Sequence, residues 1–204
     1  KRKSMWFGSK QIQTTELYCI NDDLTKMELT KINNYLYQVS NIVPDHISKD
    51  ISEIILPYYE SNKAQWSTQE AQEDFKRTMT TAHPLCAIVE ESIRHELPYI
   101  NETLGYKWND VAGTRFWLDF PGFKCPLHLD GDLPIAMQLF WTGERATSFY
   151  NSNNENDLLF EFPMTPNTGY LMLNPVPTEN TLWHGMCHTT TLTRLSSYTY
   201  FVKD

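Results

Sequence analysis

The segment PLHLDGD holds the first pair of side chains that could do chemistry together, His128 and Asp130. Side chains two residues apart in a strand project to the same side, roughly 6–7 Å apart along the backbone. An imidazole nitrogen and a carboxylate oxygen can then converge on one cation. Gly131 and Asp132 would let the chain turn away after the pair. A His-x-Asp pair is common by chance, so a metal site needs a further ligand.

That third ligand is supplied by the segment NTLWHGM, which contains His184 far along the chain. Two histidines and one carboxylate leave coordination positions open. This is the arrangement used for iron(II) that must bind oxygen and a co-substrate together. His128, Asp130 and His184 are therefore the candidate metal ligands, and iron(II) is the candidate metal.

An anion-binding arginine follows ten residues after His184. Arg194 and Ser196 share a strand face, and a guanidinium with a neighbouring hydroxyl can hold a terminal carboxylate. This suits a dicarboxylic keto acid, which would chelate iron at one end and meet Arg194 at the other. The alternative for Arg194 is an ordinary salt bridge. Because RLSSYTYF is otherwise uncharged and expected to be buried, Arg194 should in any case have a partner.

The order of these elements resembles the 2-oxoglutarate/iron(II) dioxygenase superfamily. The shared pattern is His-x-Asp, then a distant His, then Arg-x-Ser ten residues later. The stretch DFPGFKCPLHLDGD is similar to the strand and Pro-Gly turn that precede the first ligand in that family. YLMLNP and WHGMCHTTTLTRLSSYTYF are similar to the closing part of its core. The resemblance covers about residues 110–202 and leaves the first half of the chain unassigned.

The resemblance implies a role for each of these residues. His128, Asp130 and His184 would ligate Fe(II), while Arg194 and Ser196 would bind the far carboxylate of 2-oxoglutarate, with O2 as the second co-substrate. It also implies a double-stranded β-helix fold. Halogenases of the family carry a small residue in place of the carboxylate ligand, so Asp130 favours hydroxylation or demethylation.

Other polar and aromatic residues are weaker candidates. Tyr150 and Asn174, together with Tyr170, could line the co-substrate pocket, because tyrosine hydroxyls and asparagine amides orient polar ligands. Arg115 and Trp117 share a strand face upstream of the metal motif and could bind substrate. The alternative for all five is ordinary packing or a salt bridge at the rim of the fold.

The remaining histidines and cysteines do not fit the pattern. His188 lies only six residues before Arg194 and is expected near the surface. Cys187 lies close in sequence to the metal motif but lacks the accompanying groups of a catalytic nucleophile. Cys125 is close in sequence to His128, but it is not favoured as a metal ligand. The other histidines are expected to be exposed or to lie at helix ends; they are His46, His83 and His95.

The elements that must position these residues are predicted to be strands. After about residue 110, short segments rich in β-branched and aromatic residues alternate with Pro, Gly, Asn and Asp clusters. The fold class is therefore α+β, mainly β, with a jelly-roll (double-stranded β-helix) core over about residues 110–204 and N-terminal helices packed on one sheet. The segments are TRFWLDF, PIAMQLFW, ATSFY, LLFEF, GYLMLN, NTLWHGM and RLSSYTYFV.

The first half, about residues 1–109, is predicted to be helical support. One helix would follow the caps at 21–23 and run to Val39, with Leu29 and Leu36 on its apolar face. A capping-box pattern at Ser67 would open a second helix running towards Met79. A third would begin at Pro84 and end near Gly105.

Composition limits the class of protein. A chain of 204 residues with 41% hydrophobic and 21% charged residues is expected to form a single globular domain, residues 1–204. Its formal charge of -8 makes nucleic acid an unlikely partner, because such binding requires clustered Lys and Arg. The four cysteines are scattered and no apolar run is long enough to cross a bilayer, which favours free thiols and a cytoplasmic protein.

The sequence thus favours an oxygenase that hydroxylates a C–H bond of a small molecule, an amino acid or a peptide residue, with release of succinate and CO2. One alternative is a cupin-like barrel that acts as a binding or scaffold protein without oxygenase activity. Another is a metal enzyme that uses no keto-acid co-substrate.

Overall fold

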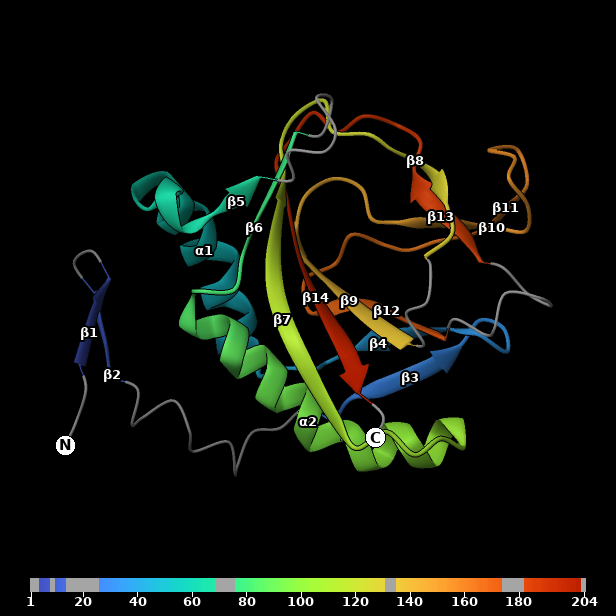
Figure 1. The fold of residues 1–204 in the computed structure, drawn as a ribbon, viewed down its shortest axis with the longest axis horizontal. Coiled ribbons are helices and arrows are strands. Elements are labelled where there is room, and N and C mark those ends of the chain that lie inside the picture. The colour runs from blue at the N-terminus through green and yellow to red at the C-terminus, as the bar shows by residue number, and fades with distance from the viewer. Residues whose placement is uncertain are drawn as a thin grey trace.

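The computed structural model describes residues 4–7, 10–13, 26–68, 76–130, 135–173 and 182–202. This part of the chain is mainly β, with two α-helices and three antiparallel sheets (Figure 1). The helical elements are α1 (Asp45–Ser61), the short 3-10 helix η1 (Lys63–Gln65) and α2 (Pro84–Leu104). A two-stranded sheet pairs β1 (Ser4–Phe7) with β2 (Lys10–Gln13).

The large sheet has eight strands in the order β3-β4-β12-β9-β14-β7-β6-β5. Its strands are β3 (Glu28–Lys31), β4 (Leu36–Ser40), β5 (Ser67–Thr68), β6 (Arg77–Thr80), β7 (Asp110–Asp119), β9 (Ile135–Thr142), β12 (Thr168–Leu173) and β14 (Arg194–Val202). The small sheet has the order β11-β10-β13-β8. Its strands are β8 (Cys125–His128), β10 (Ser148–Tyr150), β11 (Leu158–Glu161) and β13 (Trp183–Met186).

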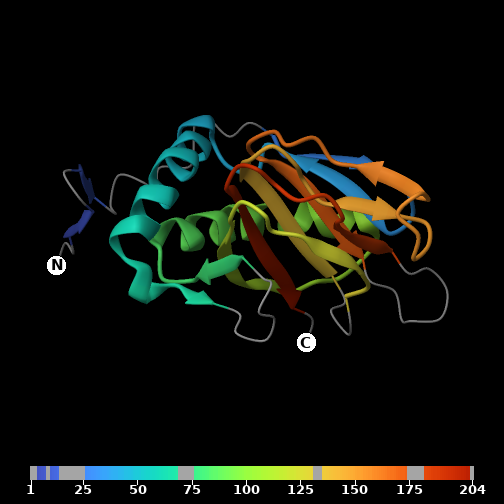
Figure 2. The same cartoon turned by 90° about the horizontal axis from the view of Figure 1, so that it is seen from above.

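The two faces of the large sheet bury different cores. Strand side chains alternate between faces, and along β9 Leu139 and Trp141 join the cluster formed with α1 and α2, whereas Phe140 joins the cluster beneath the small sheet. Figure 2 shows the green helix α2 passing behind strands of the large sheet, with α1 (cyan) at one end and β10 and β11 (orange) at the other. Both faces are therefore apolar, and the site residues lie on the face towards the small sheet.

The predicted helix beginning at Pro84 is confirmed. Pro84 stands at its first turn, and Nδ1 of His83 accepts a hydrogen bond from the backbone N–H of Leu85 at 3.2 Å. Gly105 ends the helix with φ of 68°, a left-handed conformation that favours glycine. The apolar residues Leu85, Val89, Ile93 and Leu97 recur at helical spacing and are buried, and the helix packs mainly against β7.

The predicted helix running to Val39 is wrong. Residues 21–25 lie outside the described residues, and the rest forms β3, a turn and β4. In β4 neighbouring positions are buried on opposite faces, with Leu36 in one core and Tyr37 in the other. The spacing of apolar residues fitted either structure. Pairing of β4 with β12 decided in favour of the strand.

The predicted helix from Ser67 towards Met79 is also wrong at both of its described ends. Ser67 and Thr68 form β5, and Arg77–Thr80 forms β6, which pairs with β7. Residues 69–75 lie outside the described residues. Thr78 and Thr80 are β-branched and buried, which suits a strand beside β7 better than a helix.

Helix α1 was not predicted, although Ile47, Ile51, Ile55 and Tyr58 recur at helical spacing and are buried. All seven segments predicted as strands after residue 110 do contain strands. The cysteines in the described part, Cys86, Cys125 and Cys187, are free thiols. Neither described helix is apolar enough over a sufficient length to cross a membrane.

Candidate active site

Pairing of two strands of the small sheet brings the candidate histidines together. His128 ends β8 and His184 lies in β13, and the two residues are Cα partners in the antiparallel register. Their ring centroids are 4.4 Å apart. Residues separated by 56 positions in the sequence therefore become neighbours because β8 and β13 pair.

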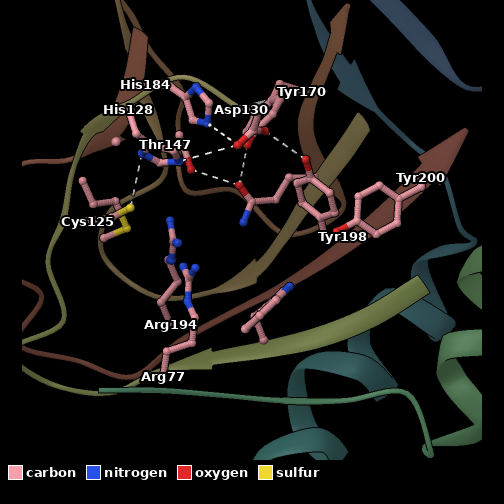
Figure 3. A pocket seen from close by; sticks show the side chains of 14 residues that line it. Arg77, Cys125, His128, Asp130, Thr147, Tyr170, His184, Arg194, Tyr198 and Tyr200 are labelled. Carbon is pink, nitrogen blue, oxygen red and sulfur yellow. Dashed lines mark hydrogen bonds and ion pairs between the residues drawn. The ribbon is translucent and has the colours of Figure 1, made fainter. Parts of the chain in front are cut away.

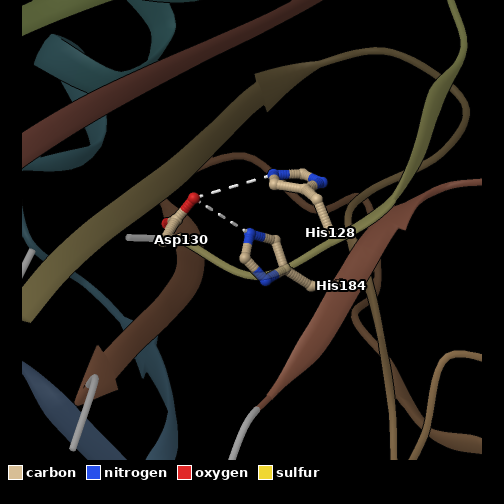
Figure 4. A group of neighbouring side chains, drawn as sticks. All are labelled: His128, Asp130 and His184. Carbon is tan, nitrogen blue, oxygen red and sulfur yellow. Dashed lines mark ion pairs between the residues drawn. The ribbon is translucent and has the colours of Figure 1, made fainter. Parts of the chain in front are cut away.

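Asp130 completes the group from the end of the β8 segment. Its Oδ1 lies 3.6 Å from Nε2 of His128 and 3.6 Å from Nε2 of His184. Figure 4 shows both imidazole rings turned towards this carboxylate. One ligand atom from each of the three residues lies within 4.8 Å of the others, a spacing that could hold a metal ion. His184 is buried and the other two are partly exposed, so the group lies at the wall of a cavity.

The backbone selects the tautomer of both histidines. Nδ1 of His128 lies 2.9 Å from the carbonyl oxygen of Pro126, and Nδ1 of His184 lies 3.0 Å from that of Leu182. A carbonyl oxygen only accepts hydrogen bonds, so each Nδ1 carries the proton. In the neutral imidazoles the lone pair then belongs to Nε2, the atom that faces Asp130. This is the arrangement a divalent metal requires.

A tyrosine holds the other oxygen of the carboxylate. The hydroxyl of Tyr198 donates to Oδ2 of Asp130 at 3.2 Å. Burial is the main cause that raises the pKa of Tyr198, so the hydroxyl stays protonated. Burial alone would raise the pKa of Asp130, but His184, His128 and Tyr198 together lower it, which keeps the carboxylate ionised.

The cavity beside this group has a volume of about 160 Å³. Charged, polar and aromatic side chains line it, and Figure 3 shows them. It extends from the His-Asp-His group to a pair of arginines, which Figure 3 shows pointing towards the same space. Its walls come from both sheets. The lining residues are Arg77, Trp117, Cys125, His128, Asp130, Gln138, Thr147, Tyr170, His184, Gly185, Met186, Arg194, Tyr198 and Tyr200.

The buried guanidinium of Arg194 has an ionic partner, as expected from the sequence. Its Nε and Nη2 donate to Oδ2 of Asp119 at 2.7 and 2.6 Å. The side chains of Arg194 and Asp119 are 1% and 0% exposed. Nη1 of Arg194 is buried and has no hydrogen-bond partner in the described part of the chain. A buried N–H of a charged group without an acceptor is costly, so this donor is suited to receive a ligand oxygen.

Ser196 lies next to Arg194 on the strand face but is fully buried behind the cavity wall. Its Oγ accepts a hydrogen bond from Nε2 of Gln138 at 3.0 Å. Oε1 of Gln138 in turn accepts from Thr147 at 3.0 Å and from Tyr170 at 2.8 Å. Ser196 thus orients Gln138, and Gln138, Thr147 and Tyr170 face the cavity.

The other predicted residues are placed differently. Trp117 lines the cavity, but Arg115 does not, and the guanidinium of Arg115 lies over the ring of Tyr200 at 4.7 Å. Tyr150 is buried outside this cavity, where burial is the main cause that raises its pKa to about 12. Asn174 lies outside the described residues.

Sequence reasoning missed several residues of the site, among them Arg77, Asp119, Gln138, Thr147, Tyr198 and Tyr200. For two of them a signal existed, because Asp119 shares a strand face with Trp117 and Tyr198 shares one with Arg194. Gln138 lies in a predicted strand without any distinguishing motif. Arg77 lies in a segment predicted to be helical, so nothing connected it to the site.

Comparison with known proteins shows similarity in structure and not in sequence. No protein-family model matches the chain, and no significant match is found among curated protein sequences. The fold is similar to that of a prolyl-4-hydroxylase from Pseudomonas putida, with a TM-score of 0.63 and 13% identity over 92% of this chain and 99% of that one.

Two further structures share the fold. One is a prolyl hydroxylase from Trichoplax adhaerens in complex with a peptide fragment of the hypoxia inducible factor oxygen degradation domain (TM-score 0.64, 12% identity, 83% of this chain and 84% of that one). The other is a viral collagen prolyl hydroxylase from Paramecium Bursaria Chlorella virus-1 in complex with 2OG (TM-score 0.57, 11% identity, 82% and 95%). The chain therefore has the fold of prolyl hydroxylases. At these identities the likeness concerns the fold alone.

Proposed function

We propose that this protein is an Fe(II)- and 2-oxoglutarate-dependent oxygenase with a double-stranded β-helix core, and that it hydroxylates a C–H bond. One observation carries the proposal. A His-Asp-His group whose two Nε2 atoms converge on Oδ1 of Asp130 and a buried arginine with an unused N–H line the same cavity. The prolyl hydroxylase fold of the chain supports this assignment.

His128, Asp130 and His184 would hold the iron, with Asp130 binding through Oδ1. Three protein ligands leave positions open for a keto acid and for oxygen. Bound iron would supply the activation of O2, so that 2-oxoglutarate and O2 convert a substrate C–H into C–OH with release of succinate and CO2.

The chain's own residues would orient the co-substrate. Arg194 would donate from Nη1 to the distal carboxylate, and Gln138, Thr147 and Tyr170 would offer polar atoms along the cavity wall. The position of Ser196 gives it the indirect role of holding Gln138. Trp117, Tyr198 and Tyr200 bring aromatic surface to the cavity, which would exclude water from the reacting C–H bond.

A peptide residue is the substrate class favoured by the structural neighbours. All three are named as prolyl hydroxylases, and one of them is in complex with a peptide fragment. A peptidyl proline is therefore the first substrate to test, with free amino acids and small metabolites as the comparison.

The test is succinate formation from 2-oxoglutarate by the iron-loaded protein, screened over proline-containing peptides, amino acids and small molecules. We expect succinate only in the presence of iron, O2 and an accepted substrate. His184→Ala should abolish stoichiometric iron binding and succinate formation. His188→Ala is the matched control, because His188 is exposed four residues later and should change neither. Iron retained by His184→Ala would refute the metal site.

Binding of 2-oxoglutarate separates this function from its alternatives. An anaerobic charge-transfer band between iron and 2-oxoglutarate is expected for the oxygenase. A scaffold protein without a metal would show no such band, and neither would a metal enzyme that uses no keto acid. Absence of this band would overturn the proposal.

A further inference from the structure

Three charged side chains lie in register across three neighbouring strands. Asp119 at the end of β7 is the Cα partner of Arg194 on β14 and also of Arg77 on β6. Cross-strand partners project to the same side of a sheet, and both arginines line the cavity. The cluster of Arg77, Asp119 and Arg194 has two positive charges and one negative charge, so its net charge is +1.

The two carboxylate oxygens of Asp119 accept different numbers of hydrogen bonds from the two arginines. Oδ1 accepts from Nε of Arg77, while Oδ2 accepts from Nη2 of Arg77 at 3.1 Å and from both Nε and Nη2 of Arg194. Arg77 thus makes the two-point pairing, and Arg194 converges on a single oxygen. This arrangement leaves Nη1 of Arg194 unused.

Aromatic rings hold Arg77 in this position. Its guanidinium carbon lies 4.2 Å from the ring centre of Phe123 and 4.9 Å from that of Trp117. Such contacts favour a guanidinium, which stacks on aromatic faces. Burial alone would raise the pKa of Asp119, but Arg194 and Arg77 outweigh it and hold that pKa below its usual range. The carboxylate therefore stays charged at neutral pH and compensates one of the two positive charges of the cluster.

We propose that Arg77 is a positioning residue for the keto-acid co-substrate, because it neutralises Asp119 and so leaves Arg194 with an uncompensated charge and a free Nη1 for the distal carboxylate. The proposal rests on the proposed function. Without Arg77, Asp119 and Arg194 would form a neutral pair, and Oδ1 of Asp119 would be free to compete for the second arm of Arg194. A dicarboxylate would then meet no net positive charge.

The test is the dissociation constant of 2-oxoglutarate for the anaerobic Fe(II)-loaded protein, measured by calorimetry. We expect Arg77→Met to weaken binding about 10- to 100-fold, the loss expected for one charged hydrogen-bonding partner. The affinity for Fe(II) should not change. 2-Oxopentanoate lacks the distal carboxylate, and we expect it to bind wild type and variant equally.

A charge-restoring variant distinguishes this role from a structural one. Arg77→Met combined with Asp119→Asn returns the net charge of the cluster to +1, and its affinity for 2-oxoglutarate should recover to within about threefold of wild type. If Arg77 merely supported the fold, the second change would bring no recovery. Arg77→Lys retains the charge and should keep most of the affinity, which covers the case in which Arg77→Met does not fold.

A matched control separates local from overall charge. Arg145 is half-exposed, pairs with Glu161 at 3.9 Å and lies outside the cavity. Arg145→Met changes the net charge of the protein by the same amount and should leave 2-oxoglutarate binding unchanged. Unchanged affinity in Arg77→Met, or no recovery in the double variant, would overturn this inference alone. Absence of 2-oxoglutarate binding by the iron-loaded wild type would overturn the proposed function as well.

Discussion

Tyr198 binds one oxygen of the Asp130 carboxylate and leaves the other oxygen facing the two histidines. The Tyr198 hydroxyl donates to Oδ2 at 3.2 Å, while Oδ1 is the atom that faces Nε2 of both His128 and His184. The hydrogen bond therefore fixes the rotation of the carboxylate and reserves Oδ1 for a metal. Partners that orient a metal ligand in this way contribute to metal affinity although they never touch the ion.

Tyr198→Phe is expected to weaken Fe(II) binding about 10- to 100-fold, because it removes the hydroxyl and keeps the ring. Tyr200→Phe is the matched control, because it removes a hydroxyl from a second tyrosine of the same strand, whose ring lies 5.0 Å from that of Tyr198. Metal dissociation constants measured anaerobically in competition with a chelator would decide. Equal constants for wild type and Tyr198→Phe would show that Asp130 is oriented without the tyrosine.

The free energy of unfolding should fall as the pH is lowered from 6.5 to 4, because the imidazole of His83 is buried in its neutral form. The side chain is 2% exposed, and burial lowers its pKa from 6.5 to about 4. The folded state keeps His83 neutral while the unfolded state takes up a proton below pH 6.5. Its contribution is therefore fully present above pH 6.5 and is lost as the pH falls, by about 3 kcal/mol at pH 4.

His83→Asn keeps a cap acceptor and removes this titration. Urea unfolding of the metal-free proteins at several pH values should give a shallower pH dependence for the variant. His95→Asn, at an exposed position of the same helix, should follow the wild-type curve. Parallel curves for wild type and His83→Asn would contradict the prediction.

Gly169 allows β12 and β9 to approach each other closely. A Cβ at this position would lie 1.9 Å from the backbone carbonyl oxygen of Gln138. Gly169→Ala should therefore lower the free energy of unfolding by about 3 kcal/mol or more, since backbone atoms of a central strand must move. Gly105→Ala gives the comparison, because an added Cβ there meets nothing within 4 Å. The left-handed φ of 68° should be the main cost of this substitution, about 1 kcal/mol. Similar losses for both variants in denaturant unfolding would refute the steric account.

Trp141 and Ser197 form a buried hydrogen bond between β9 and β14. The indole N–H of Trp141 donates to Oγ of Ser197 at 3.0 Å, and both residues are at most 1% exposed. Ser197→Ala leaves that N–H without its acceptor and should cost about 1–3 kcal/mol. In a Trp141→Phe background the same change should cost less than about 0.5 kcal/mol, because no donor remains to be satisfied. Equal costs in both backgrounds, measured by urea unfolding, would show that the bond contributes nothing.

Local pattern was sufficient for several elements. The helix from Pro84 to Gly105 could be predicted because its caps and its apolar period lie within the segment itself. The same holds for the strands after residue 110, which are set apart by turn residues. The His-x-Asp spacing, with His184 and Arg194 further on, could also be identified, since residue type and order alone carry that pattern.

Long-range pairing decided the rest. The segment from Leu29 to Val39 has apolar residues that suit a helix or a strand, and the pairing of β4 with β12 and with β3 makes it β structure. Arg77 has no local motif, and its place beside Asp119 exists only because β6 pairs with β7. The sequence by itself thus determined which side chains could hold a metal and an anion. The tertiary structure decided which partners those side chains have, because hydrogen bonds and charge balance depend on neighbours that are distant along the chain.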